Sequence, residues 1–291
     1  MRPAKTIAAW VKCYWRVFSK SFLALLVVLV SSISVYGNQR EMAPIVPSDY
    51  QGDLQFLTKA RIFFGHQSVG RNVLEGLVEN SDQVKSPLRI VRADSASIDS
   101  LPGLFHADIG KNREPIRKIE AFTRFVLESR ERNYDVVILK FCYDDLRHGG
   151  FDRAHALVEE YAKSVAAVRT TAPQLRLIRA TIPLRADPLG WKTAIKRLLN
   201  RSTEEDADNQ LRNVFNSELR KRFAGEAIFD IAEIESTLRQ GQRSYFISGN
   251  DTIYTLAAIY TADGGHLNAL GRQHVAADFI RVVAGTLRKG R

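Results

Sequence analysis

The sequence predicts a single α/β domain built around a parallel sheet, and three observations support this prediction. Apolar runs of strand length alternate along the chain with segments whose apolar residues recur at helical spacing. One run, residues 134–141, is almost continuously apolar, which is typical of a central parallel strand covered on both faces. The composition, 45% hydrophobic and 25% charged over 291 residues, is globular and excludes disordered, collagen-like and multi-span membrane proteins.

Each element of this domain has its own signal in the sequence. Short apolar runs predict strands at residues 61–64, 88–91, 134–141, 175–182 and 227–232. Amphipathic spacing predicts helices at residues 69–78, 115–129, 151–171 and 268–287. Strands connected through helices form right-handed crossovers and therefore a parallel sheet. Residues 186–209 are polar and charge-rich, and we interpret them as a surface excursion rather than a second domain.

The first 37 residues have the organisation of an export signal. Five basic residues and no acidic residue accompany an apolar run at 22–30, which small residues follow. An uncleaved membrane anchor formed by residues 10–36 is the alternative interpretation. Both place the body of the protein outside the cytoplasm, either secreted or periplasmic, or anchored to a membrane. Residues 38–57 are interpreted as a linker and residues 58–291 as the domain.

The charge and the cysteine content exclude several other classes of protein. The net charge is +10, but half of it belongs to the first 37 residues, so the body is only mildly basic. Basic residues are not interleaved with aromatic ones as in a nucleic-acid groove, and we expect no nucleic-acid partner. Two cysteines are too few for a disulfide scaffold or a zinc knuckle, and Cys142 has no obvious partner.

Polar residues gather where the predicted strands end. In parallel α/β sheets, ligands bind beyond the carboxyl ends of the strands, so these segments are the candidate site. They are Gly-His-Gln-Ser at 65–68, Cys-Tyr-Asp-Asp at 142–145, Thr-Ile-Pro at 181–183 and Asp-Gly-Gly-His at 263–266.

Three of these residues have the side chains of a catalytic triad. A serine hydroxyl needs a base to take its proton and a group that orients the base. Ser68 follows the first strand, and Asp263 and His266 lie three residues apart in one glycine-containing loop. Two plainer interpretations stay open, because a serine at this place is often a helix cap and Asp-Gly-Gly-His is also a turn sequence.

The chain resembles the SGNH, or GDSL-like, hydrolases over most of residues 58–287. The late segment Tyr-Thr-Ala-Asp-Gly-Gly-His-Leu-Asn at 260–268 is the more specific match, and His-Gln-Ser-Val at 66–69 is a degenerate early motif. The resemblance implies a flavodoxin-like three-layer α/β/α sandwich. It also implies a serine esterase without metal or cofactor, with Ser68 as nucleophile, His266 as base and Asp263 as its partner.

The sequence departs from the pattern of this family at the residues that form the oxyanion hole. The family uses the serine N–H, a glycine after the second strand and the asparagine of a Gly-x-Asn-Asp motif. The glycine could be Gly103 or Gly110, and residues 142–145 contain no asparagine. An ionised aspartate cannot donate a hydrogen bond, so another donor is needed. The candidates for oxyanion or substrate binding are His66, Gln67, Gly103, Tyr143 and Asp145.

For Asp145 the sequence also predicts a structural role. A free carboxylate would oppose the negative charge of an oxyanion, so its charge should be satisfied by hydrogen bonds or an ion pair. We expect its partners to be backbone N–H groups near Ser68, the side chain of Arg71 or the loop that carries His66. The alternatives are a solvated strand-end aspartate and a titrating catalytic group.

The leading functional hypothesis is hydrolysis of an ester, most simply a small acyl group on a glycan or lipid. Acyl transfer to a sugar hydroxyl by the same triad is one alternative, and a non-catalytic glycan-binding protein that keeps the fold is another. A metal site built from His66, Asp145, Asp263 and His266 lacks the usual ligand spacing. Cys142 is interpreted as a buried core thiol rather than a nucleophile.

Overall fold

The structure is a computed structural model that describes residues 49–93, 100–188, 196 and 203–289. The predicted export signal or anchor within residues 1–37 lies outside this range. Among the described helices, none combines the length and the apolar character needed to cross a membrane.

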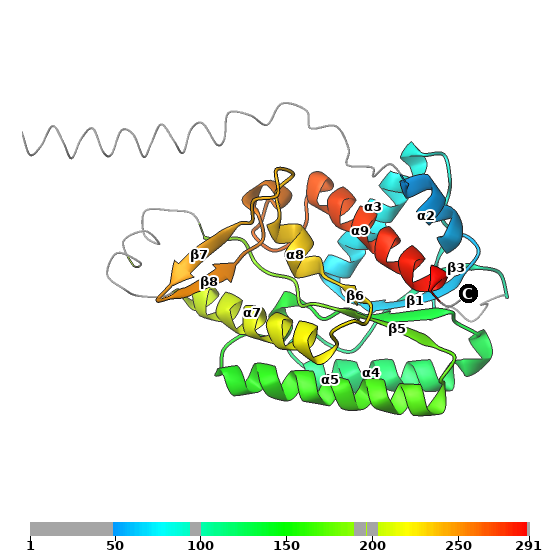
Figure 1. Ribbon diagram of the computed structural model, residues 1–291, viewed down its shortest axis with the longest axis horizontal. Coiled ribbons are helices and arrows are strands. Elements are labelled where there is room, and N and C mark those ends of the chain that lie inside the picture. The colour runs from blue at the N-terminus through cyan, green and yellow to red at the C-terminus, as the bar shows by residue number, and fades with distance from the viewer. Residues whose placement is uncertain (1–48, 94–99, 189–195, 197–202, 290–291) are drawn as a thin grey trace, which may run out of the picture. The chain divides into compact units, whose positions relative to one another are not determined.

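A six-stranded parallel sheet forms the centre of the domain (Figure 1). Its strands lie in the spatial order β2-β3-β1-β4-β5-β6, and each pairs with its neighbours in parallel. Their bounds are β1 Arg61–His66, β2 Ile90–Arg92, β3 Gly103–Asp108, β4 Val136–Leu139, β5 Arg176–Ala180 and β6 Ile228–Phe229. The carboxyl ends of β1 and β4, which carry the candidate site, are therefore adjacent at one edge of the sheet.

Helices cover both faces of the sheet, which confirms the predicted three-layer α/β/α sandwich (Figure 1). The helices on one face are α2 Tyr50–Leu57, α3 Ser68–Gln83, α8 Ile231–Ser236 and α9 Ala269–Arg288. Those on the other face are α4 Pro115–Glu128, α5 Phe151–Thr171 and α7 Glu204–Arg222. The short 3₁₀ helices are η1 Arg130–Arg132, η2 Tyr143–Asp145 and η3 Ala258–Tyr260.

The central strand β4 shows why the sequence folds this way. Val136 and Ile138 pack into the core under α3 and α9, while Val137 and Leu139 pack into the core under α4 and α5. All four side chains are at most 1% exposed. Successive side chains of a strand point to opposite faces, so a strand buried on both faces has to be apolar throughout.

Helices α3 and α9 pack backbone to backbone. A Cβ atom added to Gly76 of α3 would lie only 2.2 Å from the carbonyl oxygen of Arg272 in α9. At Gly271, in the first turn of α9, a Cβ atom would lie 2.5 Å from the carbonyl oxygen of Tyr260. No side chain larger than a hydrogen fits at either contact. The helix that begins with Ser68 is thus fixed closely against the helix that follows His266.

The structure differs from the expected elements in several places. The segment 38–57, interpreted as a linker, contains helix α2, whose Tyr50, Leu54 and Leu57 are buried against α9. Strand β3 was not expected, and residues 231–232 start helix α8 rather than extending the fifth strand. Helix α7 begins at Glu204, within the expected surface excursion.

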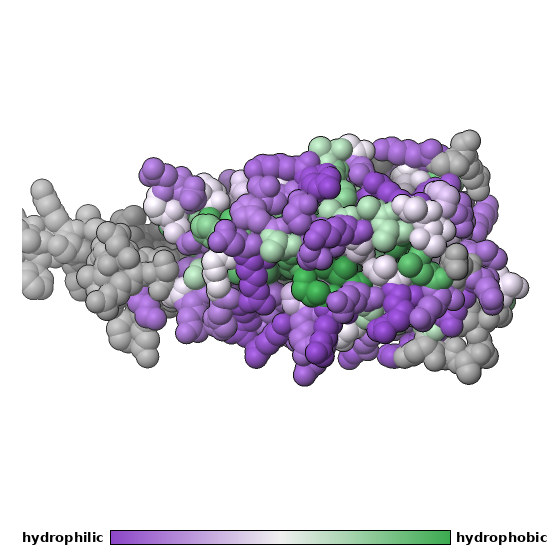
Figure 2. Space-filling view, turned by 90° about the horizontal axis from the view of Figure 1, so that it is seen from below, coloured by the Kyte–Doolittle hydropathy of each residue, from purple (hydrophilic) through white to green (hydrophobic). Residues whose placement is uncertain are grey.

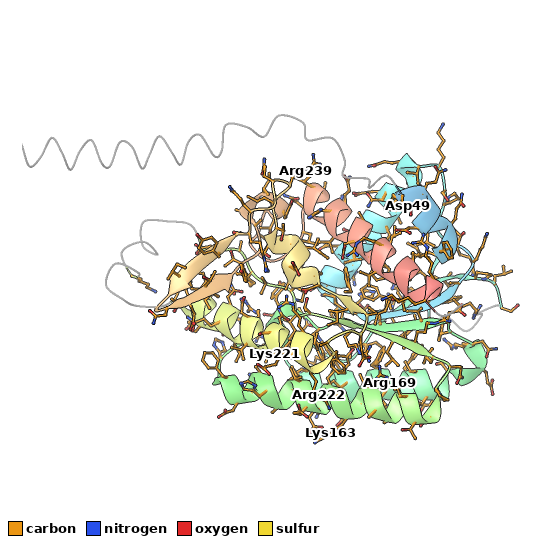
Figure 3. The ribbon with its side chains drawn as sticks, in the orientation of Figure 1. Asp49, Lys163, Arg169, Lys221, Arg222 and Arg239 are labelled. Carbon is orange, nitrogen blue, oxygen red and sulfur yellow. The ribbon has the colours of Figure 1, made fainter. Side chains whose placement is uncertain are left out.

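Strands β7 Tyr245–Ser248 and β8 Asp251–Tyr254 form a second, separate sheet, which is antiparallel. The face of the molecule in Figure 2 is mostly hydrophilic, and hydrophobic side chains show only in a limited central area. Charged side chains project outward from the long helices; the side chain of Lys163 on α5, labelled in Figure 3, is 70% exposed. The large apolar side chains are mainly in the two core layers.

Candidate active site

Ser68 is placed by the turn from β1 into α3. The strand ends at His66, Gln67 has an extended backbone, and Ser68 is the first residue of the helix. Gln67 occupies the N-cap position, so Ser68 does not have the role of a helix cap. The Ser68 hydroxyl is partly exposed, and its oxygen lies 3.6 Å from the sulfur of Cys142, just beyond the end of β4.

Asp263 and His266 form a hydrogen-bonded pair in the loop before α9. Asp263 Oδ2 lies 2.7 Å from His266 Nδ1, while Oδ1 accepts the N–H groups of Gly265 at 2.8 Å and His266 at 2.7 Å. Gly264 has a φ of +80°, which a residue with a side chain rarely adopts. The tight turn therefore lets one carboxylate bind the ring and the backbone of the same histidine.

The charge state of this pair follows from its hydrogen bonds. Partial burial raises the pKa of Asp263, but the hydrogen bonds from the ring and backbone of His266 and from Gly265 outweigh it and hold this pKa well below its usual range. An ionised carboxylate only accepts, so His266 Nδ1 donates to it, and in the neutral imidazole Nε2 is then the acceptor. The His266 side chain is 43% exposed.

One contact joins this loop to α3, and another joins it to Tyr143 after β4. The backbone N–H of Leu267 donates to the side-chain oxygen of Asn72, one turn beyond Ser68 in α3, at 3.1 Å. The ring of His266 stands edge-on to Tyr143 at 5.8 Å between centroids, and Tyr143 follows Cys142. The loop of Asp263 and His266 thus lies beside the helix that begins with Ser68. Within the described chain, no hydrogen bond joins Ser68 to His266; such bonds are often loose before substrate binds.

The structure separates the two glycine candidates. Gly103 pairs with Arg61 at the amino end of β1, and its N–H donates to Ala60, so it lies at the sheet edge opposite Ser68. Gly110 follows the carboxyl end of β3 and lies at the same edge as Ser68. Of the two, only Gly110 lies at the sheet edge that carries Ser68.

Gln67 holds the Gly110 loop in place. Its side-chain Nε2 donates to the carbonyl oxygens of Ile109 at 3.2 Å and Gly110 at 2.9 Å. The N–H of Gly110, an exposed residue with a φ of +61°, has no hydrogen-bond partner among the described residues. Gln67 was expected as a donor to the oxyanion, but both of its amide hydrogens are already used by this loop.

His66 lies below the site rather than in it. It is 2% exposed, with Gly70 of α3 packed against its ring and His106 Nδ1 3.1 Å from its Nε2. Burial first, and then the charges of His106 and Lys140, lower the pKa of His66 to about 3. The ring is therefore neutral near pH 7 and does not reach the surface where an ester would bind, contrary to the expectation for this residue.

Tyr143 borders the site as expected. Its ring contacts His266 and packs against Gly265, and the guanidinium of Arg185 lies 5.2 Å from the ring centroid. Burial, with the neighbouring Cys142 and Asp144, raises the pKa of Tyr143 to about 12. The phenol is therefore neutral and able to donate a hydrogen bond near pH 7.

Asp145 is fully buried, at 0% exposure, and accepts three hydrogen bonds. Its Oδ2 accepts from Cys142 N at 2.7 Å and Lys118 Nζ at 2.6 Å, and its Oδ1 accepts from Arg113 N at 2.9 Å. These partners are not the ones expected, since neither the Ser68 turn nor Arg71 takes part. Asp145 fixes the end of β4 to α4 and to the loop after β3, and it cannot contact substrate.

The Lys118 ammonium also orients a residue that the sequence did not single out. Lys118 Nζ lies 2.8 Å from Asn112 Oδ1, in the loop that contains Gly110. An ammonium group only donates, so the contacting atom of Asn112 must be its oxygen. The NH₂ group of Asn112 has no partner in the described part of the chain and is available to a ligand.

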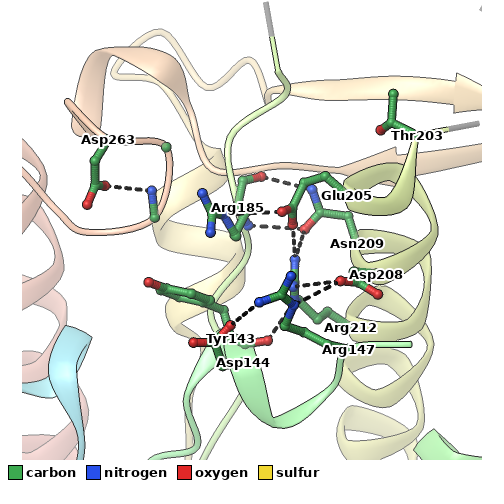
Figure 4. Close-up of polar contacts among 12 residues, drawn as sticks. Tyr143, Asp144, Arg147, Arg185, Thr203, Glu205, Asp208, Asn209, Arg212 and Asp263 are labelled. Carbon is green, nitrogen blue, oxygen red and sulfur yellow. Dashed lines mark hydrogen bonds and ion pairs between the residues drawn. The ribbon is translucent and has the colours of Figure 1, made fainter. Parts of the chain in front are cut away.

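A network of arginines and acids lies beside Tyr143 (Figure 4). Its members are Asp144, Arg147, Arg185, Glu205, Asp208, Asn209 and Arg212. Arg212 is 0% exposed and donates to the carbonyl oxygen of Tyr143 at 2.9 Å. The acidic start of α7 is the one local sequence signal for this network, and we interpreted it as surface.

The structure also bears on the two alternative chemistries, a cysteine nucleophile and a metal site. Cys142 is 0% exposed, as expected of a core thiol, although its sulfur adjoins the Ser68 hydroxyl. Among the residues that the structure describes, no three His, Cys, Asp or Glu side chains are grouped as metal ligands.

Comparison with known proteins finds similarity in structure only. No protein-family model matches the sequence, and no curated protein matches it. A carbohydrate esterase of family 3 from Talaromyces cellulolyticus is 12% identical, with a TM-score of 0.41, over 79% of this chain and 99% of that one. The periplasmic domain of a lipopolysaccharide acetyltransferase from Salmonella ser. Paratyphi A is 14% identical, with a TM-score of 0.42, over 78% and 84%.

A protein described as a GDSL-like lipase, from Parabacteroides merdae, is 12% identical, with a TM-score of 0.39, over 77% of this chain and 95% of that one. The GDSL-like class to which the sequence showed a resemblance is thus found among the solved structures similar to this chain. Because the identities and TM-scores are low, the function has to be argued from the residues of this chain.

Proposed function

We propose that the protein is a serine hydrolase of the SGNH type that cleaves a carboxylic ester. One observation carries the proposal: the 2.7 Å pair of Asp263 and His266 is held against the helix that begins with Ser68. With the ring neutral, the pair leaves His266 Nε2 as a proton acceptor at the sheet edge where Ser68 is partly exposed.

The proposed reaction has two stages, acylation of Ser68 and hydrolysis of the acyl-serine, and His266 transfers a proton in each. Ser68 Oγ attacks the ester carbonyl while His266 Nε2 takes the hydroxyl proton, and Asp263 stabilises the imidazolium that forms. The C–O bond to the alcohol then breaks, and His266 returns the proton to the departing alkoxide oxygen. Water attacks the acyl-serine in the same way, with His266 as base, and releases the carboxylic acid and the free serine.

Three donors support the oxyanion in this proposal. Ser68 N–H belongs to the first turn of α3, where backbone N–H groups have no partner within the helix. Gly110 N–H is exposed and unpartnered in the described residues, on a loop that Gln67 fixes to the nucleophile turn. The NH₂ group of Asn112, oriented by Lys118, takes the role of the asparagine that residues 142–145 lack.

The substrate class and the place of action are further parts of the proposal. Residues 1–37 have the pattern of an export signal or anchor, so the enzyme acts outside the cytoplasm. A small acyl group on a glycan or lipid is the ester class that we propose there.

A fluorophosphonate probe tests the nucleophile. We expect it to label Ser68 in the wild-type protein and to label neither Ser68→Ala nor His266→Ala. Cys142→Ala is the matched control, because its sulfur lies beside the same hydroxyl, and it should keep the label. Labelling at another residue, or none on folded protein, contradicts the proposal.

Incubation with an activated acetyl ester and glycans separates hydrolysis, which releases acetate, from transfer, which acetylates the glycan.

A further inference from the structure

Arg185 is held rigidly beside the catalytic loop. Its backbone N–H donates to Asn209 Oδ1 at 3.1 Å, and its carbonyl oxygen accepts from Asn209 Nδ2 at 2.9 Å and from Leu256 N at 3.1 Å. The next residue, Ala186, donates its N–H to the carbonyl oxygen of Gly264 at 2.9 Å. The position of Arg185 is therefore tied directly to the loop between Asp263 and His266.

The side chain of Arg185 points along this loop. Its Nε lies 3.3 Å from Glu205 Oε2, and its guanidinium lies over the ring of Tyr143. A Cβ atom built on Gly264 would lie 3.7 Å from Arg185 Nη2, so this nitrogen is next to the catalytic turn. The side chain is 29% exposed, which leaves it open to a ligand.

The other two arginines of the network are used by protein partners. Arg147 pairs with Asp144 and Asp208, and Arg212 pairs with Glu205 and donates to the carbonyl oxygen of Tyr143. Arg185 is different, because neither Nη1 nor Nη2 has a hydrogen-bond or ion-pair partner among the described residues (Figure 4). Both nitrogens stay free although the guanidinium is held by its ion pair with Glu205 and by the ring of Tyr143.

We propose that Arg185 binds a carboxylate of the substrate, so that the preferred esters carry this group close to the scissile bond. The proposal rests on the proposed esterase function. A planar guanidinium with two free N–H nitrogens matches a carboxylate bidentately. Glu205 already offsets part of the charge of this guanidinium, so a monoanion suits the site better than a doubly charged phosphate.

Matched pairs of esters test the inference. One pair is para-acetoxybenzoate and para-acetoxybenzamide, with the carboxylate on the alcohol part; the other is para-nitrophenyl hemisuccinate and its succinamate, with the carboxylate on the acyl part. We measure the ratio of kcat/KM for the acid to that for the amide. In at least one pair this ratio should exceed one and fall about tenfold in Arg185→Gln, which corresponds to about 1.4 kcal/mol.

Arg222→Gln is the control, because it removes the same charge from the end of α7, where the side chain is 52% exposed. Its ratio should match the wild-type ratio. The inference is overturned if Arg185→Gln leaves both ratios unchanged, or if Arg222→Gln lowers them equally, since long-range charge would then explain the preference.

The outcome also separates this inference from the proposed function. Turnover that survives Ser68→Ala contradicts the esterase proposal, whatever the ratios are. In that case the inference is tested by calorimetric titration of the full chain with para-acetoxybenzoate and its amide. Tighter binding of the acid that Arg185→Gln weakens about tenfold supports the carboxylate site, and equal binding of both by the two proteins overturns it.

Discussion

Asp263 and Asp145 are two carboxylates at the same edge of the sheet with opposite surroundings. The Asp263 side chain is 58% exposed, and one of its partners is an imidazole that gains and loses a proton in the proposed reaction. Asp145 is 0% exposed, and its partners are two backbone N–H groups and an ammonium. The comparison teaches that the carboxylate beside the proposed base faces water, while the carboxylate that supports the site is buried.

The largest expected effect concerns the exposed carboxylate. Asp263→Asn keeps the size of the side chain but removes the charge that stabilises the imidazolium, so kcat should fall by about 10³- to 10⁴-fold. The free energy of unfolding should change little because the side chain is exposed. Steady-state kinetics and urea unfolding measure the two quantities. A large loss of stability would mean that Asp263 supports the fold in the way that Asp145 does.

The buried carboxylate should show the reverse pattern. In Asp145→Asn, the new NH₂ group faces a donor whichever way the amide turns, and the Lys118 ammonium loses its ion pair. We expect a loss of about 3–5 kcal/mol in the free energy of unfolding. Activity should fall by a similar factor at every pH.

Asp144→Asn is the neighbouring control. The Asp144 side chain is 22% exposed and pairs with Arg147, so its loss should cost about 1 kcal/mol or less. Thermal unfolding and a pH–rate profile decide the comparison. Unchanged stability of Asp145→Asn together with a shifted profile would make Asp145 a titrating group rather than a support.

Asn112 connects the two regions, because Lys118 binds both Asn112 and Asp145. If its amide donates to the oxyanion, Asn112→Ala should lower kcat about 10²-fold with little change in KM. Asn112→Asp keeps the acceptor for Lys118 but loses the donor, and it should be at least as impaired. Full activity of Asn112→Ala would remove this residue from the oxyanion hole.

The smallest effect is a pH dependence of stability from His66. The buried ring keeps a pKa of about 3, whereas the unfolded chain takes up its proton near pH 6.5. The unfolded state therefore binds more protons between these values, and the free energy of unfolding falls as pH drops, by at most about 1.4 kcal/mol per unit. His66→Gln should reduce this acid sensitivity, and His155→Gln, an exposed control, should not. Equal slopes for all three proteins would contradict the prediction.

The sequence predicted best those features that depend on short stretches of chain. The central strand β4 and the helix α5 were marked by continuous or periodic apolar residues, and Asp263 and His266 by their spacing of three. Strand β3 was missed because Gly103–Asp108 contains a glycine, a histidine and an aspartate and no strong alternation.

Features made by distant segments could not be found in the same way. Arg185 meets Tyr143 and Glu205 only in the folded chain, and Asn112 acquires its orientation from Lys118 and, through it, Asp145. Helix α2 was assigned to a linker because its Asp, Gln and Gly residues look polar. Its few apolar side chains are nevertheless placed so that they bury against α9.

The close contact of Gly76 with Arg272 has a consequence for the order in which the protein becomes active during synthesis. The nucleophile belongs to the first strand–helix unit of the domain, whereas the base precedes α9, the last helix described. Until α9 has left the ribosome, the apolar face of α3, including Val73 and Leu77, lacks its partner. The proposed ester cleavage therefore begins only once α9 has docked, and until then the exposed apolar face of α3 makes the chain prone to aggregation.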